Sequence, residues 1–188
     1  MSAIPKSPKI SVEEYLALEE KAEFKSEFFD GEMFAMAGAT WEHNIVKDNL
    51  VGELHPRLKG TPCRTVSSDQ RLKVHGSTLY TYPDLMIMCG PVERDPLNKN
   101  TILNPIVIIE VLSPGTEAYD RGAKFRRFQK IPSVREIVLA SQSEQLIQVF
   151  ERQADDTWLL RSFDDPAGVF RLTSFPLEIP WADVYRGT

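Results

Sequence analysis

The chain has 188 residues, with 22 lysines and arginines against 27 aspartates and glutamates, so its formal net charge is −5. This length fits one domain, and the 42% of hydrophobic and 26% of charged residues exclude wholesale disorder. The acidic balance also excludes a histone-like coat of positive charge, so an anionic partner would have to meet a local basic patch.

The N-terminal segment predicts a tail followed by a short helix. Residues 1–10 carry two prolines, and we expect them to form a disordered tail. Ser11 and Glu14 have the spacing of a capping box, and the apolar residues that follow recur at helical spacing as far as Ala22.

A hairpin and a second helix are predicted next. Asp30-Gly31 between residues 24–29 and 32–37 is typical of a tight β-turn. Thr40 can cap a helix whose apolar residues recur at helical spacing until Gly60.

The middle of the chain predicts strands. Residues 63–74 and 79–88 are rich in β-branched and apolar side chains, and a turn sequence separates them. Residues 105–112 are almost continuously apolar, as in a strand buried on both faces. Residues 90–104, with several prolines and asparagines, predict a polar loop.

The last third of the chain predicts a short basic helix and further strands. The helix covers residues 120–131, a hairpin joins residues 135–141 to 145–152, and another strand covers 158–163. This order of elements predicts an α/β or α+β fold in which helices flank a mixed β-sheet.

The cysteines and the apolar segments indicate the cellular compartment of the protein. Cys63 and Cys89 match no close-spaced metal motif and are too few for a secreted disulfide scaffold. The longest apolar run, residues 106–109, is far shorter than the roughly 20 residues of a membrane span, and the N-terminus lacks the apolar segment of a signal peptide. We therefore expect a cytoplasmic protein with no membrane association and with both thiols reduced.

Two carboxylates stand out against their surroundings. Glu110 lies in the middle of the most apolar predicted strand, where an unpaired charge costs several kcal/mol. A metal or a fixed cation would account for it, and a Glu–Arg ion pair that serves only the fold is the alternative. Asp84 follows Pro83 just before an apolar run, and this dipeptide alone indicates a turn. If Asp84 and Glu110 lie on adjacent strands, however, their carboxylates can share Mg²⁺ or Mn²⁺.

A cluster of positive charge follows these carboxylates. Five basic residues fall within ten positions, namely Arg121, Lys124, Arg126, Arg127 and Lys130. A solvated helix face is one interpretation, and contact with phosphate is the other.

Taken together, these residues resemble the PD-(D/E)XK superfamily of restriction-endonuclease-like nucleases. More narrowly, the chain resembles the Uma-type putative restriction endonucleases, a family abundant in cyanobacteria. The resemblance covers about residues 11–160 and is carried by Pro83-Asp84, by Glu110 in the segment EVLSPGT, and by Asp120 with Lys124. It implies a single nuclease-like domain over residues 11–188.

The resemblance also implies a function. Asp84 and Glu110 would bind Mg²⁺ or Mn²⁺, and a metal-activated water would hydrolyse a phosphodiester bond in DNA. The superfamily motif has lysine two residues after the glutamate, but Leu112 occupies that position here. We expect Lys124 to supply the missing ammonium, while Arg121, Arg126, Arg127 and Lys130 contact the nucleic acid.

Three further residues match family positions and are candidates for the same site. They are Glu27, His43 and Asp69. Each has an ordinary alternative: a solvated strand carboxylate for Glu27, a hydrogen-bonded surface group for His43 and a turn residue for Asp69.

The sequence therefore predicts a Mg²⁺-dependent DNA endonuclease. The main alternative is a catalytically silent binding module that keeps the nuclease fold, and Leu112 and the acidic total charge favour this alternative. Another alternative is an interaction domain without a nucleic-acid role. The many aromatic residues after position 157 also predict a homodimer, unless they pack within the chain.

Overall fold

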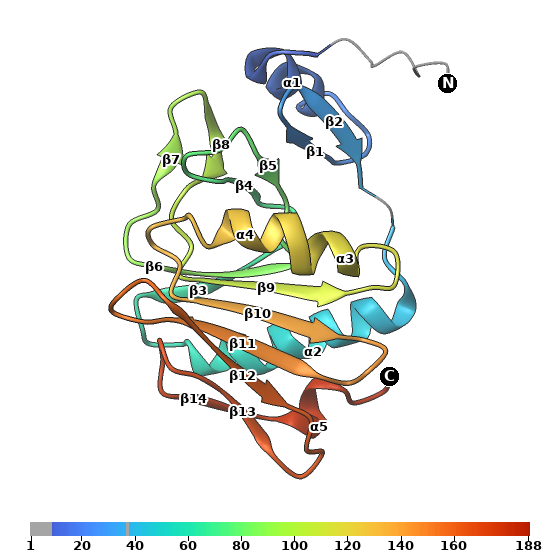
Figure 1. The fold of residues 1–188 in the computed structure, drawn as a ribbon, viewed down its shortest axis with the longest axis vertical. Coiled ribbons are helices and arrows are strands. Elements are labelled where there is room, and N and C mark those ends of the chain that lie inside the picture. Colours follow the sequence, from blue (N-terminus) through green and yellow to red (C-terminus); the bar gives the residue numbers. More distant parts are fainter. Residues whose placement is uncertain (1–8, 37) are drawn as a thin grey trace.

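The computed structural model describes residues 9–36 and 38–188, and Figure 1 shows its ribbon. The elements in chain order are α1 (Val12–Glu19), β1 (Ser26–Phe29), β2 (Glu32–Ala35), α2 (Trp41–Arg57), β3 (Cys63–Ser67), β4 (Arg71–Lys73), β5 (Tyr80–Thr81), β6 (Leu85–Cys89), β7 (Arg94–Asp95), β8 (Asn98–Ile102), β9 (Val107–Leu112), α3 (Glu117–Tyr119), a π-helical turn (Asp120–Lys124), α4 (Phe125–Phe128), β10 (Glu136–Ser141), β11 (Ile147–Arg152), β12 (Trp158–Phe163), β13 (Val169–Leu172), β14 (Leu177–Pro180) and α5 (Trp181–Val184).

Two six-stranded sheets and a small ribbon make up the β-structure. The central sheet has the order β12-β11-β10-β9-β6-β3, and the second sheet has the order β2-β1-β5-β4-β8-β7. β9 and β10 pair in parallel, whereas β9 and β6 pair antiparallel, so the central sheet is mixed. Helices lie on both sides of the central sheet (Figure 1), which confirms the predicted mixed α/β fold.

The central sheet is covered on both faces, and β9 lies in its interior. Val107, Ile109 and Val111 pack with the apolar face of α2. Ile108 and Leu112 point to the opposite face and pack with α4 and part of the second sheet. Because strand side chains alternate, Glu110 lies on this second face with only 3% of its surface exposed.

The chain crosses between the two sheets where the sequence predicts continuous strands. The segment 63–74 divides into β3 of the central sheet and β4 of the second sheet, and 79–88 divides into β5 and β6 in the same way. Pro83 has no N–H group to continue a ladder, so the second break falls at Pro83-Asp84. The prediction of two unbroken strands was therefore wrong, and the break leaves Asp84 immediately before β6.

The predicted polar loop at 90–104 contains a hairpin. β7 and β8 pair antiparallel, and β8 also pairs in parallel with β4. The loop prediction was wrong here because a partner strand distant in the sequence can hold even a polar segment in a sheet.

The predicted basic helix at 120–131 begins earlier and is irregular. α3 starts at Glu117, a π-helical turn spans Asp120–Lys124, and α4 ends at Phe128. A π-helical turn widens the helix locally and is frequent at functional sites. Here both ends of the turn, Asp120 and Lys124, are buried.

The other predicted helices and hairpins lie close to their expected positions. The capping box at Ser11 and Glu14 forms as predicted, and Thr40 caps α2. Most of the predicted tail, residues 1–8, and position 37 lie outside the described residues. Ile10 donates its N–H to the carbonyl of Gly31 at 2.9 Å, so this end of the predicted tail contacts the β1–β2 turn. Within residues 9–36 and 38–188, no helix has the length and apolar character needed to span a membrane.

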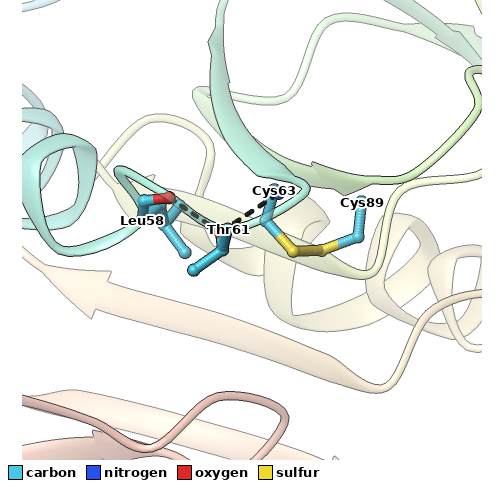
Figure 2. The surroundings of a disulfide bond; sticks show 4 residues. All are labelled: Leu58, Thr61, Cys63 and Cys89. Atoms are coloured by element: carbon cyan, nitrogen blue, oxygen red, sulfur yellow. Dashed lines mark hydrogen bonds between the residues drawn. A yellow bond between two sulfur atoms is a disulfide. The ribbon is translucent and has the colours of Figure 1, made fainter.

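The two cysteines form a disulfide, so the prediction of reduced thiols was wrong. Cys63 and Cys89 face one another in the antiparallel pair of β3 and β6, where facing side chains are close enough to bond. Figure 2 shows the bond beside the turn that follows α2, where Thr61 accepts the N–H of Cys63 and donates to the carbonyl of Leu58. Sequence spacing alone could not indicate this register.

Breaking the disulfide should lower the melting temperature by about 5 to 10 °C, because a cross-link of this loop length restricts the unfolded chain. Dithiothreitol should therefore destabilise the wild-type protein and leave the double variant Cys63→Ser/Cys89→Ser unchanged. Equal melting of the wild type with and without reductant, or two reactive thiols in the native protein, would contradict the bond.

The C-terminal aromatic residues pack mainly within the chain. Phe170, Trp181 and Tyr185 are buried in the cluster that α2 forms with the central sheet, and Phe163 and Phe175 pack against it. The aromatic surface on which the predicted homodimer rested is therefore largely used internally. β12, in contrast, is an edge strand of the central sheet and exposes Leu159 and Leu160.

The homodimer stays a prediction, and this edge is the surface we expect it to use, since exposed edge strands pair readily with another chain. Light scattering at micromolar concentration should give twice the chain mass of 21.4 kDa, and Leu160→Lys should return it to the monomer. A wild-type mass of 21.4 kDa would rule the dimer out.

Candidate functional site

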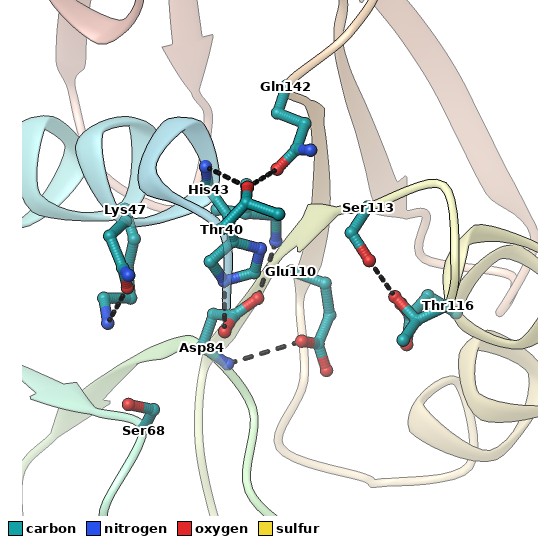
Figure 3. Close-up of polar contacts among 12 residues, drawn as sticks. Thr40, His43, Lys47, Ser68, Asp84, Glu110, Ser113, Thr116 and Gln142 are labelled. Carbon is teal, nitrogen blue, oxygen red and sulfur yellow. Dashed lines mark hydrogen bonds and ion pairs between the residues drawn. The ribbon is translucent and has the colours of Figure 1, made fainter. Parts of the chain in front are cut away.

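Asp84 and Glu110 lie side by side, where β6 begins beside β9. β6 and β9 are antiparallel with Leu85 opposite Ile109, and the next step along this register places Asp84 opposite Glu110. The backbone N–H of Asp84 donates to Glu110 Oε2 at 3.3 Å, and that of Val111 donates to Asp84 Oδ2 at 2.8 Å. Figure 3 shows the two carboxylates close together, as the sequence predicts.

The ammonium of Lys124 contacts Glu110. Its Nζ lies 2.8 Å from Glu110 Oε1, 3.2 Å from Glu27 Oε1 and 3.5 Å from Asp120 Oδ1. The π-helical turn directs both Asp120 and Lys124 inward, and only 6% of the lysine side chain is exposed. Asp120 was not among the predicted site residues, although its i, i+4 spacing from Lys124 could have indicated it.

Leu112 fills the position where the superfamily motif has lysine. It is buried in the cluster that contains Phe128 and Ile108. The side chain therefore stabilises the packing of α4 on the central sheet, while the positive charge beside Glu110 comes from Lys124.

Glu27 joins the cluster from the second sheet. The hydroxyl of Thr81 on the adjacent strand donates to Glu27 Oε1, and the Tyr119 hydroxyl donates to Oε2 at 3.0 Å. Together with its ion pair to Lys124, these contacts place Glu27 in the interior rather than among the solvated strand carboxylates.

His43 reaches Asp84 from the opposite side. It lies in the first turn of α2, where its backbone N–H donates to the capping hydroxyl of Thr40. Its Nε2 lies 3.0 Å from Asp84 Oδ1 (Figure 3). An ionised carboxylate can only accept, so Nε2 carries the proton in this bond.

Asp69 lies outside the cluster. Its side chain is 89% exposed and pairs with Lys25 Nζ at 2.8 Å. This ion pair holds the pKa of Asp69 below its usual value. The contacts match the alternative interpretation of Asp69, that of a surface residue in the connection between β3 and β4.

The basic residues around Lys124 have different environments. Arg121 bonds to Glu117 and Gln148, and the guanidinium of Arg127 lies 3.7 Å from the centre of the Phe29 ring. Arg126 and Lys130 are exposed. Arg126 lies in α4, whereas Lys130 lies two residues beyond the end of that helix.

The cluster holds more carboxyl groups than cations. The carboxyl groups of Glu27, Glu110 and Asp120 contact the ammonium of Lys124, and Asp84 lies beside Glu110. Burial raises the pKa of Glu110 well above its usual value despite the nearby Lys124, and the Asp84 and Asp120 charges add to this. Burial likewise raises the pKa of Asp120.

Asp84 and Lys124 are ionised for different reasons. Burial alone would raise the pKa of Asp84, but hydrogen bonds from His43 and Val111 outweigh it and lower that pKa. Burial alone would lower the pKa of Lys124, but the charges of Glu110, Glu27 and Asp120 outweigh it and raise that pKa well above its usual value. Lys124 therefore acts as a cation at neutral pH and cannot serve as a general base.

The donor set suits a hard divalent cation, because it consists of the carboxyl oxygens that such cations prefer as ligands. Among the described residues, no three His, Cys, Asp or Glu side chains are arranged to hold a metal ion. The protein would therefore contribute Asp84 and Glu110, and water or substrate oxygens would complete the coordination. With a divalent cation bound, such a cluster could bind a phosphate group and stabilise negative charge on it.

Comparison with known proteins gives one family and one shared fold. The family model "Uma2: Putative restriction endonuclease" matches residues 12–182. The uncharacterized protein slr1290 of Synechocystis is 34% identical over 96% of this chain and 93% of its own length. The uncharacterized protein sll1609 of Synechocystis is 32% identical over 80% of this chain and 85% of its own length. A DUF820 putative nuclease from Anabaena variabilis has a similar fold, with a TM-score of 0.76, 21% identity, and coverage of 94% of this chain and 97% of its own.

Proposed function

Because the chain belongs to the Uma2 family of putative restriction endonucleases, we propose that it hydrolyses phosphodiester bonds in DNA with Mg²⁺ or Mn²⁺. The observation that carries the proposal is that Glu110 of β9 contacts both Lys124 and the backbone of Asp84, which directly precedes β6. A cluster of this composition is costly to bury in a protein that needs only its fold.

In this proposal, Asp84 and Glu110 hold the divalent cation. When bound, the cation would neutralise phosphate charge and lower the pKa of a coordinated water. The hydrogen bonds from His43 and Val111 keep Asp84 ionised and fix its orientation. His43 is thus a positioning residue.

Lys124 stabilises the negative charge that develops on the phosphoryl group during hydrolysis. Its ammonium is held by Glu27, Glu110 and Asp120, so the charge is already oriented before substrate binds. Glu27 in turn is fixed by Thr81 and Tyr119. These residues position the lysine, and Lys124 acts on the substrate.

The proposal is tested by incubating supercoiled and single-stranded DNA with the protein in Mg²⁺, Mn²⁺ or EDTA. Wild type and the matched surface variant Asp69→Asn should cleave equally in either metal, and Asp84→Asn should not cleave. Cleavage by Asp84→Asn at the wild-type rate would overturn the assignment. Binding of DNA without cleavage by any variant would favour the silent module that Leu112 suggests.

Arg126 and Lys130 are the basic residues that we propose for backbone contacts, with a smaller part for Arg121 and Arg127, which already have partners within the chain. Each phosphate contact releases counterions, so the DNA-binding constant falls as the salt concentration rises. Arg126→Ala and Lys130→Ala should each reduce the magnitude of the slope of log binding constant against log salt concentration by about 1. Arg121→Ala should change this slope less. Equal slopes for the wild type and for both exposed variants would exclude Arg126 and Lys130 from DNA binding.

A further inference from the structure

Lys47 carries a positive charge near the candidate site that the proposed hydrolysis does not use. It lies in α2 four residues after His43, so the two side chains project from the same face of the helix, about 6 Å apart along its axis. From this face His43 bonds to Asp84. Figure 3 shows His43 and Lys47 both extending from α2 toward the side on which Asp84 and Ser68 lie.

The printed partner of the Lys47 ammonium is a neutral group. Its Nζ donates to Asn44 Oδ1 at 3.3 Å, and the residue is half-buried. Among residues 9–36 and 38–188, no carboxylate forms an ion pair with Lys47, and the nearby Asp69 pairs with Lys25 instead. Lys124 differs, because three carboxylates contact its ammonium. The charge of Lys47 is therefore left for an anion from outside the chain.

We propose that Lys47 binds the phosphate next to the scissile one, so that the site holds two successive phosphates of a DNA strand. This inference rests on the proposed function, because a cation at Asp84 and Glu110 would place the scissile phosphate. The ammonium has three N–H donors and Asn44 takes one, so two remain for phosphate oxygens. The flexible four-carbon stem lets this point charge follow the backbone of the bound strand.

A contact with the neighbouring phosphate differs in its kinetic effect from a contact with the scissile one. The charge of the neighbouring phosphate does not change during hydrolysis, so Lys47 should stabilise the bound substrate and the transition state equally. Loss of such a contact raises KM and leaves kcat nearly the same. Loss of Lys124, which acts on the reacting phosphate, should instead lower kcat.

Two substrates test the inference in the presence of Mn²⁺. Plasmid DNA has successive phosphates, whereas bis(p-nitrophenyl) phosphate has a single phosphodiester and no neighbouring phosphate for Lys47. Lys47→Met should raise KM for plasmid DNA about ten-fold, as expected for the loss of one hydrogen bond to a charged group. The change in KM for bis(p-nitrophenyl) phosphate should be much smaller.

Matched variants separate the phosphate contact from a general effect of charge. Lys47→Arg keeps the cation and should restore most of the affinity for plasmid DNA. Lys59→Met removes an exposed lysine just beyond the other end of α2 and should behave like wild type with both substrates. The salt dependence of plasmid binding gives a test that needs no hydrolysis. Lys47→Met should reduce the magnitude of the slope of log binding constant against log salt concentration by about 1.

The failures of this inference and of the proposed function are distinguishable. An equal rise in KM on both substrates in Lys47→Met, or plasmid kinetics and salt slopes equal to those of Lys59→Met, would overturn the neighbouring-phosphate contact and keep the hydrolytic function. If the wild type hydrolysed neither substrate, the hydrolytic function would fail. A salt slope that falls in Lys47→Met but not in Lys59→Met would then still support the phosphate contact, and equal slopes would overturn it as well.

Discussion

Replacing Glu110 with glutamine should abolish metal-dependent cleavage and, at the same time, raise the melting temperature of the metal-free protein. The residue is buried near Asp84, Asp120 and Glu27, and Lys124 provides a compensating ammonium. Glutamine keeps the shape and removes one of the crowded charges. Loss of activity with a gain of stability is expected of a residue kept for function rather than for folding.

The gain in stability should depend on pH. Burial raises the pKa of Glu110 well above 4.5, so the folded state holds this proton more tightly than the unfolded chain does. Such a group supports folding below its unfolded pKa, and this contribution is lost as the pH rises toward the folded pKa. The difference between Glu110→Gln and wild type should therefore be small at pH 4 and grow toward neutral pH.

Glu136 provides the matched control. It is also a fully buried glutamate on the central sheet, but its carboxylate accepts the N–H groups of Thr173 and Ser174 at 2.8 and 2.9 Å. Glu136→Gln should destabilise the fold, because these bonds favour the charged acceptor. If both variants lowered the melting temperature equally, Glu110 would be a structural residue and the functional assignment would be wrong.

Replacing Lys124 with methionine should lower the cleavage rate by about 10²-fold or more, because charge on the phosphoryl group would lose its stabilising ammonium. Asp84 and Glu110 remain, so metal binding should persist. The same change leaves several buried carboxylates without a cation, a situation that costs about 3–5 kcal/mol. We therefore expect the metal-free variant to melt about 10 °C below wild type.

A divalent cation should offset this loss, so Mg²⁺ should raise the melting temperature of Lys124→Met more than that of wild type. The raised pKa of Lys124 means that its stabilising charge is fully present at neutral pH and is lost only above its ordinary value of 10.5. Lys130→Met, on the exposed surface six residues later, should melt like wild type. Wild-type cleavage by Lys124→Met would exclude the lysine from the reaction.

The convergence of Asp84 and Glu110 was predictable because both residues contradict their local surroundings. A glutamate in the most apolar strand and an aspartate after proline are both costly unless something meets them, and they do converge. The resemblance to the nuclease superfamily, with Leu112 at the position of the motif lysine, implied that Lys124 supplies the ammonium, and Lys124 contacts Glu110.

The features that were missed depend on contacts between distant segments. The Cys63–Cys89 bond requires the register of β3 and β6, and the hairpin at β7 and β8 requires β4 as a partner. The crossings between the two sheets follow from the same pairing. Local propensity and spacing hold no information about such registers, so the division of two predicted strands could not be inferred from them.

Calorimetric titration with Mn²⁺ tests the central claim, that Asp84 and Glu110 form a metal-dependent hydrolytic centre. Wild type and the surface variant Asp69→Asn should bind Mn²⁺ with equal affinity, and Asp84→Asn and Glu110→Gln should show no heat of binding at the same concentrations. Mn²⁺ binding that persists unchanged in both site variants, or a wild-type protein that binds no Mn²⁺, would contradict the account.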